Sequence, residues 1–236
     1  MSKIVKYQNG SLIEYEIYNL VDFYDPILRA PTIPVKLSTA AEKKRADTVA
    51  SSLCETLRKH EGLGLSANQC GKTERIFALN MGEEIWALFN PEIIERSETL
   101  SEFQEGCLSY PGLYLKVKRS DKIKVKFQAI DGEWIEQEFD GLTAVCVQHE
   151  IDHLDGKVYT DLVSPIKLDQ AKRKVKQYKK RWKKYIAQHQ LAQQQMLEKQ
   201  KQAATQSHGP IIQILGGSGP IPSPQKQPEK FVYNQD

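Results

Sequence analysis

The chain has 236 residues, of which 40% are hydrophobic, and its formal net charge is +3, from 33 basic and 30 acidic residues. This length allows one domain with a substantial core and an appendage. The nearly balanced charge excludes nucleic-acid binding based on the charge of the whole chain, and it leaves only local basic segments as candidates.

Residues 1–24 carry aromatic and polar side chains without the apolar core of a secretion signal, and we expect an N-terminal arm with a short strand. No stretch of the chain approaches the roughly 18 apolar residues of a membrane span. We therefore expect a cytoplasmic protein, or one from a compartment that is similarly reducing. In such a reducing compartment the four cysteines stay free thiols, at positions 54, 70, 107 and 146.

The central part of the chain predicts helices and strands. Residues 25–35 contain three prolines and predict an extended connection, and residues 37–62 predict a helix with a capping box at Thr39 and Glu42 that ends at Gly62. In residues 122–130 apolar side chains alternate with lysines, which indicates an antiparallel sheet with one face in water. Asp131 and Gly132 predict a hairpin. The predicted strands are 75–80, 85–89, 113–117, 122–130 and 134–139.

A second helix is predicted at 142–154, closed by Gly156, and a third, rich in Lys, Arg, Gln and Ala, at 167–204. Gly, Pro, Ser and Gln then dominate, which predicts disorder. We expect four parts: an arm (1–24), a central domain (25–165), a basic helix (166–205) and a disordered tail (206–236). The fold class is α+β, with antiparallel sheets around the helix at 142–154.

The stretch His149-Glu150-Ile151-Asp152-His153 places two imidazoles four residues apart, on one face of a helix. One helical turn brings both within reach of a single metal ion, with a glutamate between them to handle protons. The alternative is a surface helix with two chance histidines. The apolar residues that precede the motif indicate a buried helix, and buried histidines need partners, so we favour a metal site.

A catalytic metal usually takes three protein ligands and keeps one position open. Two familiar protease patterns place the third ligand downstream of the two histidines. One needs a histidine six residues after the second, where this chain has Tyr159. The other needs a glutamate from a following helix, but no glutamate lies between Glu150 and Glu198. His189 lies in a polar segment rich in lysine. The third ligand should therefore lie upstream, where Cys107 sits in the predicted tight turn GCLSYPG.

Three stretches in this order resemble the signature motifs of peptide deformylases: GLGLSANQ (62–69), EGCLS (105–109) and QHEIDH (148–153). The resemblance covers about residues 25–165 and includes DPILR (25–29), FNPEI (89–93) and Arg119. It implies metal ligation by Cys107, His149 and His153. The ion is expected to be Fe(II), with Zn(II), Ni(II) or Co(II) possible in the purified protein.

The reaction implied by the resemblance is hydrolysis of the N-formyl group of the N-terminal formylmethionine of nascent peptides, which releases formate. A metal-bound hydroxide attacks, and Glu150 is expected to take the proton of the water and deliver it to the departing amine. Gln69, through its side-chain amide, and Leu108, through its backbone N–H, are expected to stabilise the oxyanion.

Other residues are expected to bind peptide or to support the ligands. Leu63, Gly64 and Gly106 are expected to bind the peptide as an added strand. Behind the ligands we expect Glu105, Arg119 and Asp152, with Glu105 paired to Arg119.

Some positions depart from the family pattern or favour a structural role. Ser66 and Asn68 stand where similar proteins often have alanine and a small apolar residue or proline, and we expect altered packing behind Gln69. Cys54 and Cys146 are expected in the core, as is Cys70, for which contact with the site is the alternative.

From Lys167 to Lys184 there are ten basic residues and one acid, with Tyr178, Trp182 and Tyr185 interleaved. One interpretation is a solvated helix whose apolar seam, from Val175 to Ile186, rests on the domain. The other is phosphate binding, with ribosomal RNA as the polyanion near a nascent chain. The two are compatible.

Two rival functions stay open from the sequence. A zinc endopeptidase would need a third ligand other than Cys107 and would cleave internal peptide bonds. A ribosome-binding protein built on an inactive hydrolase would keep its metal without turnover.

Overall fold

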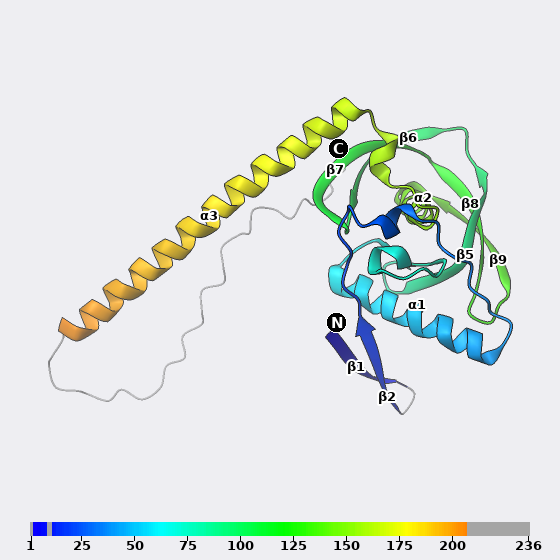
Figure 1. Cartoon of the computed structure of the whole chain (residues 1–236), viewed down its shortest axis with the longest axis horizontal. Helices are drawn as coiled ribbons and strands as arrows, with labels where there is room; N and C mark the ends of the chain where they lie inside the picture. Colours follow the sequence, from blue (N-terminus) through cyan, green and yellow to red (C-terminus); the bar gives the residue numbers. More distant parts are fainter. Residues whose placement is uncertain (1, 9–10, 207–236) are drawn as a thin grey trace. The chain divides into compact units, whose positions relative to one another are not determined.

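The computed structural model of the chain describes residues 2–8 and 11–206 (Figure 1). The chain divides into two units, residues 1–182 and 183–236, and the predicted site lies within the first. The tail predicted at 206–236 lies, from residue 207 onward, outside the described residues. None of the described helices is long and apolar enough to cross a membrane.

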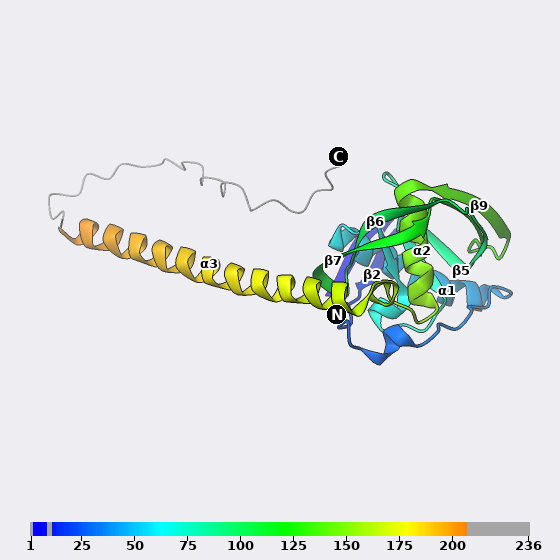
Figure 2. The same cartoon turned by 90° about the horizontal axis from the view of Figure 1, so that it is seen from above.

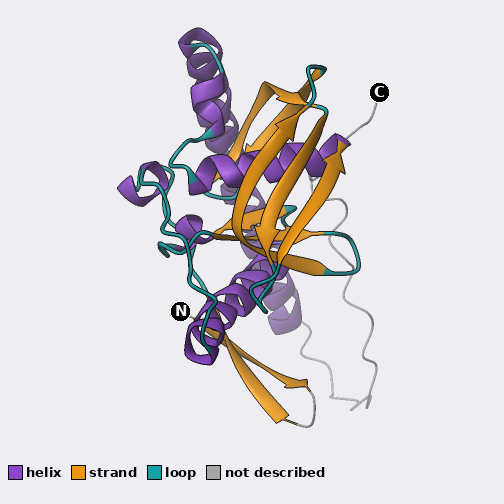
Figure 3. Ribbon diagram, turned by 90° about the vertical axis from the view of Figure 1, so that its right-hand side faces the viewer, coloured by secondary structure: helices purple, strands orange, loops and turns teal. Residues whose placement is uncertain are grey.

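The largest sheet has five antiparallel strands, in the order β3 (Gly64–Ser66), β4 (Ile76–Asn80), β5 (Ile85–Arg96), β8 (Lys122–Gln128) and β9 (Trp134–Asp140). Figure 3 shows these strands as a curved sheet across one side of a helix. In β8 the alternation predicted from the sequence is confirmed, since Ile123, Val125 and Phe127 are buried and the lysines between them face outward. β3 lies at one edge of this sheet.

β5 runs further than the predicted 85–89. Asn90 adopts a left-handed conformation with φ of 51°, and the register with β8 shifts between Phe89 and Glu92. Asparagine tolerates this conformation, and its side chain makes hydrogen bonds of 2.8 Å in both directions with the backbone of Val35. The strand therefore accommodates Pro91 at an irregularity, where a missing N–H costs no ladder bond.

A second sheet pairs β6 (Leu100–Cys107) with β7 (Tyr110–Ser120), and it carries the second signature motif, residues 105–109. The sequence did not predict β6, because its polar side chains hide the apolar alternation that marks a strand. The tight turn predicted around Cys107 is present, since Cys107 pairs with Tyr110 across residues 108 and 109.

Helix α2 (Gly141–Leu154) lies between the two sheets, and ten of its 14 residues are buried. Figure 1 shows it along its axis and Figure 2 across its axis, with β6 and β7 on one side and β5 and β9 on the other. Its apolar side chains pack against the large sheet, with Ala144, Val147 and Ile151 meeting Phe77 and Leu88. A helix buried on nearly all sides is the central helix that the sequence predicted.

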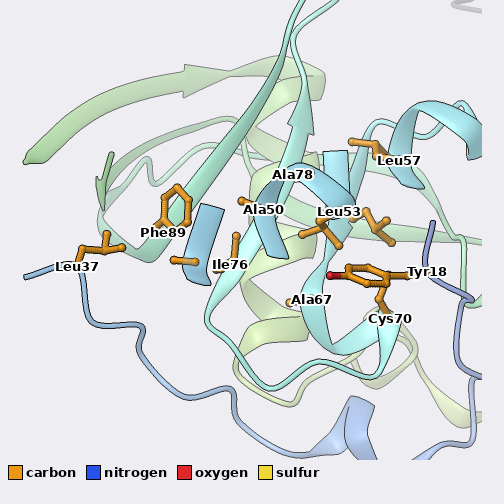
Figure 4. Close-up of a cluster of buried hydrophobic side chains, with 12 residues drawn as sticks. Tyr18, Leu37, Ala50, Leu53, Leu57, Ala67, Cys70, Ile76, Ala78 and Phe89 are labelled. Carbon is orange, nitrogen blue, oxygen red and sulfur yellow. The ribbon is translucent and has the colours of Figure 1, made fainter. Parts of the chain in front are cut away.

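Helix α1 (Ala40–His60) covers the other face of the core. The capping box is confirmed, because Thr39 accepts a hydrogen bond from the Glu42 N–H and Glu42 accepts one from the Thr39 N–H. The prediction that Gly62 ends the helix is wrong by one residue: Glu61 takes the left-handed capping position, with φ of 52°. Figure 4 shows the cluster beneath α1, which holds Ala50, Leu53, Leu57, Ile76, Ala78, Phe89, Tyr18 and Cys70.

Residues near the N-terminus form a hairpin, β1 (Ser2–Gln8) with β2 (Ser11–Ile17), where an arm with one short strand was expected. The N–H of Tyr18 donates to the Thr56 hydroxyl at 2.9 Å, which ties this region to α1. Part of the connection predicted as extended instead forms a short 3-10 helix, η1 (Pro26–Arg29). Two more, η2 (Ala67–Cys70) and η3 (Tyr159–Leu162), precede β4 and α3.

Helix α3 (Pro165–Gln206) begins on the first unit. Leu168, Ala171 and Val175 pack against a cluster that includes Leu113 and Val117 of β7. Of the predicted apolar seam, Val175 packs on this cluster, whereas Tyr178 is 55% exposed. The side chain of Trp182 lies outside the described residues. Most of the basic face therefore lies in water.

Candidate metal centre

Three donor atoms from two distant segments converge beside α2. His149 and His153 project from one face of the helix, with ring centroids 4.9 Å apart. Cys107, at the end of β6, places its sulfur 3.3 Å from Nε2 of His153, and the donor atoms of all three residues lie within 4.8 Å of one another. Both histidines are buried and Cys107 is half-buried.

This donor set fits a divalent transition metal. Bonds of about 2.3 Å to sulfur and 2.0–2.1 Å to nitrogen in a tetrahedral site separate the two ligands by roughly 3.5 Å, close to the 3.3 Å between Cys107 and His153. A thiolate and two imidazoles suit iron, zinc, nickel or cobalt better than magnesium. Three protein ligands also leave a position for water or substrate.

The charges around the histidines suit a cation as well. Burial alone would lower the pKa of His149, but hydrogen bonds with Cys107 and Glu105 outweigh it and raise the pKa to about 10. Burial, with repulsion from His149, holds the pKa of His153 well below its usual value. The acidic groups beside His149 therefore favour positive charge at this place.

A buried ion-pair network orients His149. Its Nδ1 lies 2.8 Å from a carboxylate oxygen of Glu105, which leaves Nε2 for a metal. Arg119 donates two hydrogen bonds to Glu105, of 2.7 and 2.9 Å, and a third to Asp152. The predicted pairing of Glu105 with Arg119 is thus present. Burial alone would raise the pKa of Glu105, but the bonds from Arg119 and His149 lower it and keep the carboxylate charged.

Glu150 lies between the two histidines in sequence and is only 3% exposed. Burial raises its pKa, against the opposing effects of the His149 charge and a hydrogen bond from Ser66. Gly64 packs directly on it, since a Cβ at that position would lie 2.6 Å from the Glu150 carboxylate and 2.7 Å from the sulfur of Cys146. A glycine is therefore required at position 64, where β3 crosses this carboxylate.

Gln69 points its amide nitrogen at the site. That nitrogen lies 3.4 Å from the Cys107 sulfur and 3.4 Å from the Ser109 hydroxyl. Its amide oxygen accepts the N–H of Ser66 at 2.8 Å, which fixes the orientation of the amide. Leu108 directly follows Cys107, lies in the turn between β6 and β7, and is half-buried.

The residues predicted to bind peptide border the same site. Leu63 and Gly64 lie at the start of the edge strand β3, and the Leu63 side chain is 43% exposed. Gly106 precedes Cys107, and the ring of Tyr114 occupies the space that a Cβ at Gly106 would need, with 2.6 Å between that Cβ and the ring. Cys70 belongs to the core beneath α1, where burial raises its pKa to about 12.

Sequence reasoning missed the roles of Ser66 and Asn68. Both face α2: the Ser66 hydroxyl contacts Glu150, and the Asn68 amide donates to the backbone oxygen of His153 at 2.6 Å. Both side chains are fully buried. The available signal was the presence of two polar residues inside a buried motif, since a buried polar group needs a partner.

Comparison with known proteins agrees with this geometry. A family model described as polypeptide deformylase matches residues 17–169. The chain belongs to the polypeptide deformylase family. It is 38% identical over 165 residues to peptide deformylase 1 of Ralstonia nicotianae, which covers 69% of this chain and 95% of the relative. With the peptide deformylase of Alkalilimnicola ehrlichii, identity is 41%, over 67% of this chain and 89% of the relative.

Solved structures give the same result. The crystal structure of the peptide deformylase from Thermotoga maritima has a TM-score of 0.60 and 36% identity, and it covers 64% of this chain and 100% of that one. The structure of a peptide deformylase from Synechococcus elongatus, in complex with actinonin, has a TM-score of 0.60 and 32% identity, and the match covers 66% of this chain and 85% of that one. Peptide deformylases are metal-dependent hydrolases that remove the N-formyl group from nascent peptides, so the chain is a hydrolase of this type.

Proposed function

We propose that this deformylase hydrolyses the formyl group of N-terminal formylmethionine on nascent peptides and releases formate, with the residues predicted from the sequence. The observation that supports this most directly is the convergence of Cys107, His149 and His153 beside the buried carboxylate of Glu150. The compartment would be one with bacterial-type translation, because that is where formylated chains arise.

Cys107, His149 and His153 would hold the metal, with Fe(II) as the ion we expect physiologically. When bound, a divalent ion of this kind acidifies a coordinated water and polarises a carbonyl oxygen. The three side chains fix its position, and Glu105 keeps His149 in the tautomer that can bind it.

Glu150 acts as the general base and then as the general acid. It accepts a proton from the attacking water, whose oxygen forms the new bond to the formyl carbon. When the C–N bond breaks, Glu150 delivers the proton to the departing amine. The raised pKa that burial gives Glu150 suits a group that must hold a proton for part of the cycle.

The formyl oxygen gains negative charge during the attack, and two donors would stabilise it. Gln69 offers its amide N–H, already directed toward the Cys107 sulfur, and Leu108 offers its backbone N–H. Loss of one such donor typically lowers the rate about 100- to 1000-fold.

The peptide would bind as a strand beside β3, the edge strand of the large sheet. Edge strands leave backbone N–H and C=O groups free for pairing, and Leu63 and Gly64 lie at the start of this edge. Gly106 borders the same space on the β6 side. The methionine side chain would enter an apolar pocket next to the site.

A formate assay tests the proposal. The purified chain, prepared without oxygen, should release formate from a formylmethionyl tripeptide, and Glu150→Ala should keep its metal and lose turnover by about 100- to 10,000-fold. Cleavage of internal peptide bonds without formate release would favour the endopeptidase, and a metal-loaded parent chain without turnover would refute the proposal.

We further propose that the basic face of α3 contacts ribosomal RNA. Between residues 167 and 184 nine of the ten Lys and Arg side chains are exposed, and Lys172 is half-buried. Phosphate contacts by such residues give binding that weakens steeply with salt.

Replacement of Lys176, Lys179, Lys180 and Lys183 by Gln should reduce co-sedimentation with ribosomes at low salt and spare formate release. A control with Lys36→Gln and Lys44→Gln should sediment like the parent, and equal sedimentation of all three proteins would refute the contact.

A further inference from the structure

Ser66 ends β3 with its side chain directed at α2. Its hydroxyl lies 2.6 Å from Oε2 of Glu150 and 2.9 Å from the backbone oxygen of the same residue. Ser66 is fully buried, so no water competes for this contact. A separation of 2.6 Å is typical of a charge-assisted bond from a hydroxyl to a carboxylate, which is about twice as strong as a neutral one.

The carboxylate of Glu150 needs such a restraint. The last torsion of a glutamate is broad and roughly two-fold, so packing of the chain does not by itself fix the plane of the carboxylate. Here Gly64 lies against Oε1 and the Ser66 hydroxyl holds Oε2. The two neighbours on β3 together define where both oxygens lie.

The same short segment also holds the proposed oxyanion donor. The backbone N–H of Ser66 binds Oε1 of Gln69 at 2.8 Å, while the Ser66 side chain binds Glu150. Asn68, on the same segment, binds the backbone of His153. One residue thus links the two groups that must act on the same formyl group from different elements of the fold.

We propose that Ser66 is a positioning residue for catalysis: its hydroxyl fixes the Glu150 carboxylate in the orientation needed for proton transfer. This inference rests on the proposed function of Glu150 as general base. Misplacement of a reacting group by about 1 Å can cost about 100-fold in rate.

The test compares two side chains of nearly equal shape, Ser66→Thr and Ser66→Val, which differ in the hydroxyl. We expect Ser66→Thr to keep kcat within about threefold of the parent. Ser66→Val and Ser66→Ala should lose about 10- to 100-fold in kcat, with KM and bound metal unchanged, because the metal ligands and the peptide edge are untouched. Equal kcat for the Thr and Val variants would overturn the proposal, since the effect would then be one of packing.

A crystal structure of Ser66→Ala supplies a readout that does not depend on turnover. We expect the Glu150 carboxylate to rotate or to occupy two orientations. A carboxylate that keeps the parent orientation would overturn the role of Ser66 even if activity fell. A parent chain that binds metal but releases no formate would instead refute the proposed function, and the same crystal structure would still decide whether Ser66 orients Glu150.

Discussion

At the scale of single residues, the centre depends on groups that orient one another. Arg119 neutralises Glu105, Glu105 orients His149, and His149 contributes to the donor set with Cys107 and His153. Every charge in this series is buried and paired, and removal of one partner from a buried pair leaves the other uncompensated. The three donor side chains therefore owe their geometry to residues outside the donor set.

Glu105→Gln tests this dependence. The substitution keeps the size of the side chain but removes the charge that pairs with Arg119 and weakens the bond to His149. We expect metal affinity to fall about 10- to 100-fold, the usual cost of losing such a supporting partner. Competition with a chromophoric chelator would measure it. An unchanged affinity would show that the helix alone orients His149.

At the scale of elements, the site lies where a buried helix meets two sheet edges. α2 supplies two of the donor side chains and Glu150, the end of β6 supplies the sulfur, and β3 with η2 supplies Ser66 and Gln69. α1 does not contribute a ligand, but its apolar face packs beneath β3 and β4 and holds them in place. A substitution that weakens α1 should therefore lower the stability of the fold more than it lowers the catalytic rate.

Thr39→Ala removes the side chain that caps α1. Loss of an N-cap typically costs about 1 kcal/mol of stability, which for a domain of this size lowers the Tm by roughly 2–4 °C. We expect that shift in calorimetry with unchanged kcat, because the cap lies outside the site. Thr48→Ala, on the same helix, is the matched control, since its exposed hydroxyl only binds the backbone of Lys44. Equal shifts for both variants would contradict the capping role.

At the scale of the molecule, a metal would join segments that are far apart in the chain. Cys107 precedes His149 by 42 positions, so ligation would link the β6–β7 sheet to α2. An ion that binds only the folded state stabilises it by mass action, by about 2.7 kcal/mol at 100 times its Kd. Metal should therefore contribute to folding as well as to catalysis.

Removal of the metal tests this link. Chelation should lower the Tm by roughly 5–10 °C in a thermal scan, and added Zn(II) should restore it. Cys107→Ser should largely lose the response to chelator, whereas Cys54→Ser, which changes a thiol outside the site, should keep it. A parent Tm that is insensitive to chelation would contradict the predicted link.

How far the sequence predicted the fold depends on the element. The capped helix α1, the buried helix α2 and the alternation in β8 follow from short-range patterns, and their ends were predicted to within three residues. β6 was missed because its side chains are polar, and it is a strand only through its pairing with β7. Glu61, rather than Gly62, takes the left-handed position that ends α1. Glycine is the most common residue at such a position, but the preference is statistical and does not exclude other residues.

The amino-acid sequence by itself determined the family, the two histidines on one helix face and the candidate sulfur, because motif spacing and helical periodicity are local properties. Only the tertiary structure decided that Ser66 reaches Glu150, that Asn68 reaches His153, and that Gly64 must lack a side chain. These contacts join residues more than 80 positions apart, and no pattern within a segment records which distant group will lie across the core from it.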